Sequence, residues 1–299
     1  MLITSAMSQT GGDFFRILAP IALDSTNEEE ILLSLPYLVR GLRIPPYLRL
    51  YHVLSPDRIR LAPLRGESFL HQIEQAAQQA EEKLRTYVAR LREKIPPPAE
   101  VSFHVEKQEV VGPAEEILAY MASEPYSLLI LSFKQRKKWE RFFGTTALWD
   151  LIEQSPVPVL LLSTPLTIPP RRILWITSMH SEGFPLLNTL IPLVRQIQGT
   201  LYCAKINTPS TFVTHRTFQR QVLDMCDYII DHVDPDFVPE ECLLYADKEM
   251  SEGVLHVVQD FLMDVVALDV EEALSEWKVV DKLIAQQLPV LFLRSGKGG

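Results

Sequence analysis

A basic segment near the middle of the chain has the residue types that bind anions. Lys134, Arg136 and Lys138 are among five cations within eight positions, and Gly144 follows shortly after them. Cationic side chains bind phosphates and carboxylates through charge-assisted hydrogen bonds, and a glycine lets backbone amides approach an anion closely. The segment therefore predicts a site for a phosphate or another anion. The alternative interpretation is a solvated loop, because most charge runs are solvated.

Two threonines stand directly after that glycine, where we expect a helix to begin. Thr145 and Thr146 could donate their hydroxyls to an anion, or one of them could cap the helix that runs to about Gln154. The amino-terminal end of a helix carries unpaired amides and the positive end of its dipole, and both favour an anion. The helix start therefore supports the anion site, with capping as the alternative for at least one threonine.

Catalytic and metal-binding patterns are missing from the sequence. It contains no G-x-x-x-x-G-K-(S/T), no G-x-S-x-G and no H-E-x-x-H. The seven histidines have no paired metal spacing; His256 and Asp260 lie one helical turn apart, but two ligands do not make a zinc site. His52 falls in an apolar segment, where we expect a hydrogen-bonded structural histidine. No nucleophile–base pair is evident, so we expect a protein that is not an enzyme.

Nearly continuous apolar segments alternate with helical patterns on both sides of the basic segment. This alternation predicts α/β architecture with a parallel sheet that helices cover on both faces. The expected strands are 14–22, 47–53, 100–109, 127–131 and 159–162, then 172–178, 200–206, 242–246, 265–269 and 289–293. The expected helices are 28–41, 67–93, 113–122, 145–154, 184–198, 211–232, 252–261 and 273–287.

The second half of the chain repeats the order of the first. Arg16-Ile17-Leu18 opens the first expected strand and Arg172-Ile173-Leu174 opens the sixth, while Pro158–Leu162 and Pro289–Leu293 close the two halves. Repeated order with similar ends indicates an internal duplication. We expect a leader (1–12), a first domain (13–165), a linker (166–171), a second domain (172–295) and a tail (296–299).

Composition excludes several classes of protein. The formal net charge of −9 disfavours a general nucleic-acid-binding surface, which needs an excess of Lys and Arg. No apolar run approaches the roughly 18–20 residues that span a bilayer, so we expect no membrane segment. The three cysteines are odd in number and lack C-x-x-C spacing, which indicates reduced thiols. We therefore expect a cytoplasmic protein.

Residues 127–163 resemble the carboxyl-terminal half of a universal stress protein domain. That family has an apolar strand, a G-x-x-G-x9-G-(S/T) loop, a helix and a strand after a proline-rich phrase. The matching text is L-L-I-L-S-F-K-Q-R-K-K-W-E-R-F-F-G-T-T-A-L-W-D-L-I-E-Q-S-P-V-P-V-L-L-L-S, and Asn207-Thr208-Pro209 resembles a phrase of tandem members. The resemblance implies two tandem flavodoxin-like, Rossmann-like doubly wound domains, each with a five-stranded sheet ordered 3-2-1-4-5.

The resemblance also implies a nucleotide site at the carboxyl ends of strands 1 and 4 of each domain. In the first domain it would hold ATP, ADP or a phosphate-like anion; its residues would be Pro20, Val53, Ser132, Lys134, Arg136, Lys138, Gly144, Thr145 and Thr146.

The chain departs from the family's motif at several points. Ser132 and Gln135 stand where the first two glycines belong, and Ala22 replaces the acidic residue after strand 1. In the second half Ser178 replaces that acid, and the segment from Asp269 has two further acids and no glycine. Carboxylates at a helix start compete with phosphate for the same amides. We therefore expect at most one weak site, in the first half, and none in the second.

The final strands of the halves are expected to be sheet edges, which recruit partners. By the family's mode of dimerisation, the two halves would pair these strands about a pseudo-two-fold axis; a homodimer and an unidentified protein partner are further expectations. The predicted function is a non-enzymatic stress-response regulator. The alternatives are an interaction scaffold without ligand and, less favoured, an ATP-hydrolysing enzyme.

Overall fold

The computed structural model describes residues 14–23, 32, 34–54, 67–107, 112–132 and 144–294, with only the backbone at 67–70 and 144–147. The leader and the basic residues Lys134, Arg136 and Lys138 lie outside the described residues. Among the residues that are described, no helix has the length and apolar character needed to cross a membrane.

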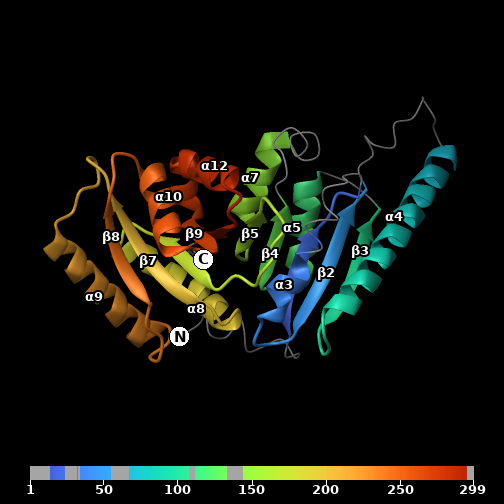
Figure 1. Cartoon of the computed structure of the whole chain (residues 1–299). Helices are drawn as coiled ribbons and strands as arrows, with labels where there is room; N and C mark the ends of the chain where they lie inside the picture. The colour runs from blue at the N-terminus through green and yellow to red at the C-terminus, as the bar shows by residue number, and fades with distance from the viewer. Residues whose placement is uncertain are drawn as a thin grey trace.

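Ten strands form one continuous sheet in the order β3-β2-β1-β4-β5-β10-β9-β6-β7-β8 (Figure 1). The strands of the first half are β1 (Phe15–Pro20), β2 (Pro46–Val53), β3 (Glu100–Glu106), β4 (Leu128–Ser132) and β5 (Val159–Leu162). Those of the second half are β6 (Arg172–Ile176), β7 (Thr200–Asn207), β8 (Glu241–Ala246), β9 (Val265–Asp269) and β10 (Val290–Leu293).

The two expected five-stranded sheets are instead one ten-stranded sheet, because β5 and β10, the final strands that were expected to pair, join the halves. Their pairing is antiparallel, with Leu161 opposite Val290 and Leu160 opposite Leu291, whereas the pairs within each half are parallel. Each final strand would otherwise leave a row of amides and carbonyls unpaired at an edge. Within each half the strand order is the expected 3-2-1-4-5.

Helices cover both faces of the sheet, and α4 and α9 lie at its two ends (Figure 1). The helices of the first half are α3 (Leu35–Arg40), α4 (Glu67–Lys94), α5 (Pro113–Ser123) and α7 (Gly144–Gln154). Those of the second half are η2 (Ser181–Leu186), α8 (Leu187–Gln196), α9 (His215–His232), α10 (Met250–Phe261), α11 (Val270–Ser275) and α12 (Trp277–Ala285).

Several helix boundaries differ from the sequence prediction, and two of them have a clear local cause. Helix α9 begins at His215 rather than near 211, because the Asn207 side chain bonds the Val213 backbone in both directions and holds the intervening loop in a turn. Thr214 then caps the helix by accepting from the Thr217 amide at 3.2 Å. The expected last helix is divided at Glu276 into α11 and α12.

Alternate side chains of each strand enter two apolar cores, one on each face of the sheet. Ile17 belongs to the core that contains side chains of α3, α4, α8 and α9, whereas its neighbour Leu18 belongs to the core that contains side chains of α5, α7, α10 and α12. This period of two is the geometry of an extended strand buried on both faces. Both cores run through both halves, so the halves share a hydrophobic interior as well as a sheet.

Candidate functional site

The winding direction of each half reverses between its first and fourth strands. Strands β1 and β4 are neighbours in the first half, and β6 and β9 are neighbours in the second. In doubly wound sheets a crevice opens outside the carboxyl ends of such strands and commonly binds ligands. The structure has a cavity at each of these two positions, and the cavities differ greatly in size.

The first-half cavity is small, about 20 Å³. Pro20, at the end of β1, and Ser132, at the end of β4, both line it, so the structure brings these two predicted site residues together. Ser132 is 7% exposed, and its hydroxyl has no hydrogen-bond partner among the described residues. A buried hydroxyl without a partner is costly, which makes Ser132 a candidate for contact with a ligand.

The remaining predicted residues of this half are only partly placed. Val53, at the end of β2, is buried in the core on the face of α5 and α7 and does not line the cavity. Gly144, Thr145 and Thr146 form the first turn of α7, as expected. Because the three basic residues lie outside the described part of the chain, their approach to Ser132 stays a prediction.

The second-half cavity is about ten times larger, at about 210 Å³, and lies where the sequence predicted no site. It opens at the ends of β6, β7 and β9, between α10 and the pair α11 and α12. Its lining residues are Ile176, Thr177, Ser178, Lys205, Ile206, Thr211, Met250, Leu268, Glu272, Ala273, Ser275, Glu276 and Val279.

A lysine and a glutamate are brought together at this cavity. Lys205 on β7 is 4% exposed, and its ammonium donates a hydrogen bond to the carbonyl of Ser178. Burial lowers the pKa of Lys205 below its ordinary value, and the nearby Glu272 carboxylate offsets part of that shift. Burial raises the pKa of Glu272, and the charge of Asp269 adds to the rise; hydrogen bonds from Ser178 and the charge of Lys205 oppose it. Both pKa values therefore move toward the uncharged forms.

The walls of the second-half cavity are held in place by local contacts. Met179 follows Ser178 with a φ of 59°, a left-handed backbone that is uncommon outside glycine, and its amide donates to the Thr177 hydroxyl at 3.1 Å. On the outer side Lys282 of α12 forms an ion pair with Glu252 of α10.

Sequence reasoning named Ser178 only as the replacement for an acidic residue, and it missed Lys205. A usable signal was present: Lys205 is the one charged residue in the run L-Y-C-A-K-I-N, which the pattern assigned to a buried parallel strand. A charged side chain on a buried strand needs a hydrogen-bonding or oppositely charged partner, or it must lie at the end of the strand beside a cavity. Glu272 had no comparable signal, because acidic residues are common in the first turn of a helix.

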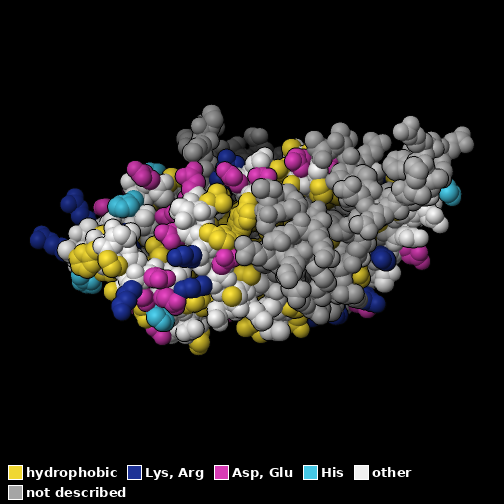
Figure 2. Space-filling model, turned by 90° about the horizontal axis from the view of Figure 1, so that it is seen from above, with side chains coloured by type: hydrophobic (Ala, Val, Ile, Leu, Met, Phe, Trp, Pro, Cys, Tyr) yellow, Lys and Arg dark blue, Asp and Glu magenta, His cyan; other side chains and the backbone are white. Residues whose placement is uncertain are grey.

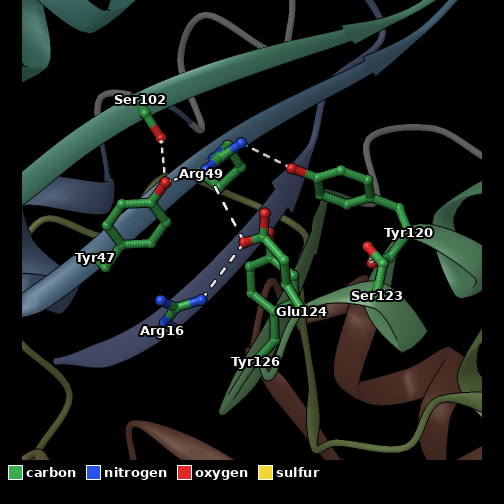
Figure 3. Close-up of polar contacts among 8 residues, drawn as sticks. All are labelled: Arg16, Tyr47, Arg49, Ser102, Tyr120, Ser123, Glu124 and Tyr126. Carbon is green, nitrogen blue, oxygen red and sulfur yellow. Dashed lines mark hydrogen bonds and ion pairs between the residues drawn. The ribbon is translucent and has the colours of Figure 1, made fainter. Parts of the chain in front are cut away.

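A second polar cluster lies near the opposite ends of the first-half strands (Figure 3). Arg49 donates to the Tyr120 hydroxyl at 2.7 Å and also to the Tyr47 hydroxyl. Glu124 lies 3.4 Å from the Arg16 guanidinium and 3.9 Å from that of Arg49. Burial disfavours the charge on Arg49, but the Tyr47 hydrogen bond and the surrounding phenol groups outweigh it, so the pKa of Arg49 is raised.

This arginine–tyrosine cluster ties strands to a helix. Ser102 of β3 donates to the Tyr47 hydroxyl of β2 at 3.1 Å, and Tyr120 belongs to α5 (Figure 3). Burial raises the pKa of Tyr126 and of Tyr120, which keeps both phenols neutral. Because the two guanidinium groups already contact these side chains, we interpret the cluster as structural.

The histidines and cysteines do not form a further site in the described part of the chain. His52 is buried and its Nδ1 lies 2.7 Å from the Ile21 carbonyl oxygen, as expected of a structural histidine. The cysteines are free thiols, and Cys203 of β7 faces Cys242 of β8. Across the described residues, no group of three or more His, Cys, Asp or Glu side chains is arranged to hold a metal ion.

Part of the chain is similar to a known protein family. Residues 47–163 match the model of the Universal stress protein family, which supports one universal stress protein domain over these residues. The match covers less than half of the chain and does not reach the second half. No curated protein matches the chain.

Solved structures similar to this chain extend over both halves. One is a universal stress protein from Archaeoglobus fulgidus DSM 4304, at 14% identity and a TM-score of 0.63, covering 96% of this chain and 100% of that chain. Another is a functionally unknown protein from Pseudomonas aeruginosa PAO1, at 16% identity and a TM-score of 0.53, covering 94% of this chain and 92% of that one. At identities this low, the similarity shows a shared fold alone and says nothing about function.

Proposed function

We propose that this protein is a non-enzymatic regulatory protein of the universal stress protein type, built from two such domains in tandem. In this proposal the first half holds one weak site for ATP, ADP or a phosphate-like anion. The observation that carries it is the buried hydroxyl of Ser132 beside Pro20, which has no hydrogen-bond partner among the described residues and lies at the crevice between the ends of β1 and β4.

The chemistry around this hydroxyl suits an anion. The chain continues from Ser132 through the basic segment that contains Lys134, Arg136 and Lys138, and returns at Gly144 to the first turn of α7. Cations in the segment would replace the missing glycine amides as phosphate partners, and the amides of the α7 first turn would add the helix dipole. We expect binding to be weak because charged side chains, rather than the backbone amides of a glycine-rich loop, would contact the phosphate.

The proposed mode of action is binding without turnover. A phosphoryl-transfer enzyme needs a residue that positions the attacking nucleophile and groups that stabilise the transferred phosphoryl. Neither was recognised in the sequence, and the described residues around the first-half cavity are Pro20, Ser132 and apolar side chains. A ligand-dependent change in affinity for a protein partner is the proposed output.

Calorimetry with ATP and ADP tests this proposal on the intact chain and on three variants. Gly144→Val and Ser132→Ala should abolish or weaken binding, because the first blocks the approach of the anion and the second removes the buried hydroxyl. Ser163→Ala is the matched control, since the Ser163 hydroxyl is also buried without a partner in the described part of the chain but follows β5 instead of β4. Absence of binding at millimolar nucleotide, or equal loss in the Ser163 variant, would refute the proposed site.

An interaction scaffold is the second candidate function, and exposed apolar side chains favour it. Leu223 and Ile230 are exposed on α9 and lie seven residues apart, so they share one face of the helix. Phe212, just before α9, is 71% exposed. Since β5 and β10 pair with each other, the outermost strands of the sheet are β3 and β8, and α9 lies beside β8 (Figure 1). A protein partner or a second copy would therefore meet this end of the molecule.

A further inference from the structure

The second-half cavity is large enough for an organic ligand. An apolar cavity of roughly 150 Å³ in another protein holds a benzene molecule. The cavity beside Lys205, at about 210 Å³, would therefore accept a ring with a short substituent, about ten non-hydrogen atoms in all. Ile176, Ile206, Leu268 and Val279 supply apolar walls from three strands and a helix.

The charges at this cavity disfavour an ionic ligand. Lys205 and Glu272 are of opposite sign, so the buried part of the cavity is close to neutral overall. A further charge would be buried without compensation, and Glu276 at the cavity and Asp269 beside Glu272 would repel an anion. A polyphosphate would bring several negative charges to these carboxylates. Acidic and basic side chains are also interspersed over the second half, at the left of Figure 2, with no continuous basic field on that face.

The Lys205 ammonium has hydrogen-bonding capacity that a ligand could use. An ammonium has three donors, and the Ser178 carbonyl is the acceptor that the structure gives it among the described residues. Because the side chain is almost fully buried, solvent has little access to the remaining donors. An acceptor oxygen on a ligand would satisfy one of them without adding a charge.

We propose that this cavity binds a small uncharged amphipathic molecule, whose ring or short chain fills the apolar part and whose carbonyl or hydroxyl oxygen accepts a hydrogen bond from Lys205. The site is separate from the nucleotide site proposed for the first half and differs from it in ligand class. Such a site would let the protein respond to a small uncharged amphipathic metabolite independently of ATP.

Ligand-observed NMR titrations of the full chain test this with three probes of nearly equal size: acetophenone, benzoate and ethylbenzene. Acetophenone should bind most tightly, because it has an uncharged carbonyl; benzoate adds a charge, and ethylbenzene lacks the oxygen. Lys205→Met should weaken acetophenone binding about ten- to a hundredfold, the range expected for a hydrogen bond to a charged donor, and leave ethylbenzene binding unchanged. Saturating ATP should not displace acetophenone.

Variants at the cavity and outside it make the test specific. Ala273→Leu fills the cavity and should abolish binding of all three probes; Ser275→Phe, at an exposed position on the lining, should do the same with less risk to folding. Lys278→Met, at an exposed position on α12 outside the lining, is the control and should bind acetophenone like the parent chain. Tighter binding of benzoate, displacement by ATP, unchanged binding in the Ser275 variant, or no binding of any probe at millimolar concentration would each overturn the proposal.

Discussion

Truncation of Phe292 tests whether the two halves form one cooperative unit. Phe292 on β10 is 1% exposed, and its ring lies 6.0 Å from the ring of Trp149 on α7 in the other half. Trp149 in turn makes an edge contact with Trp277 of α12 at 4.3 Å. Phe292→Ala removes a large apolar side chain at the junction, which typically costs about 3–5 kcal/mol. The expected decrease in melting temperature is roughly 5–15 °C.

The assay is thermal and urea unfolding followed by both circular dichroism and tryptophan fluorescence. Because the sheet and both cores are continuous, the parent chain should unfold in one transition that the two probes report together. Phe212→Ala is the matched control: Phe212 is exposed, so the change should stay within about 0.5 kcal/mol. Two separate transitions in the parent chain, or a Phe292 variant as stable as the Phe212 variant, would show that the junction does not couple the halves.

Two further predictions concern the ionisable clusters. Glu272→Gln should flatten the dependence of stability on pH above about pH 4.5. Because the pKa of Glu272 is raised, the folded state binds this proton more tightly than the unfolded state does. The stability that this proton adds is therefore fully present below the pKa of Glu272 in the unfolded state, and it is lost as pH rises through the pKa in the folded state. Melting temperatures of both proteins from acid to neutral pH check this, and identical slopes would contradict it. Arg49→Met should destabilise the fold by roughly 1.5–3 kcal/mol, because Arg49 makes charged hydrogen bonds to two phenols. Urea titration measures the loss; Arg85→Met, an exposed change on α4, is the control, and equal stability of the two variants would count against the cluster's structural role.

Much of the fold could be predicted because its signals are local. Apolar runs such as Leu128–Ser132 and Val290–Leu293 identify buried parallel strands, and the repeated order of elements predicts the strand order that the two halves share. The exact helix starts could not be predicted. Helix α9, for example, begins only after Val213, whose backbone is bonded by the Asn207 side chain, and Thr214 caps the helix. A side-chain bond across six residues competes with the helix and is not encoded in apolar periodicity.

The sequence by itself determined the α/β architecture, because strand and helix periodicity are properties of neighbouring residues. The resemblance to the universal stress protein family implied the position of the crevices. It also pointed to Pro20 and Ser132, which the structure brings to one small cavity. Only the tertiary structure decided that the larger cavity lies in the second half, and it showed that the expected pairing of the final strands, β5 and β10, makes one continuous sheet. Lys205 and Glu272 are far apart in the chain and meet because β7 and α11 converge on the same edge of the sheet. The size and charge of a cavity depend on how side chains from distant elements fill the space between them, and no local pattern carries that information.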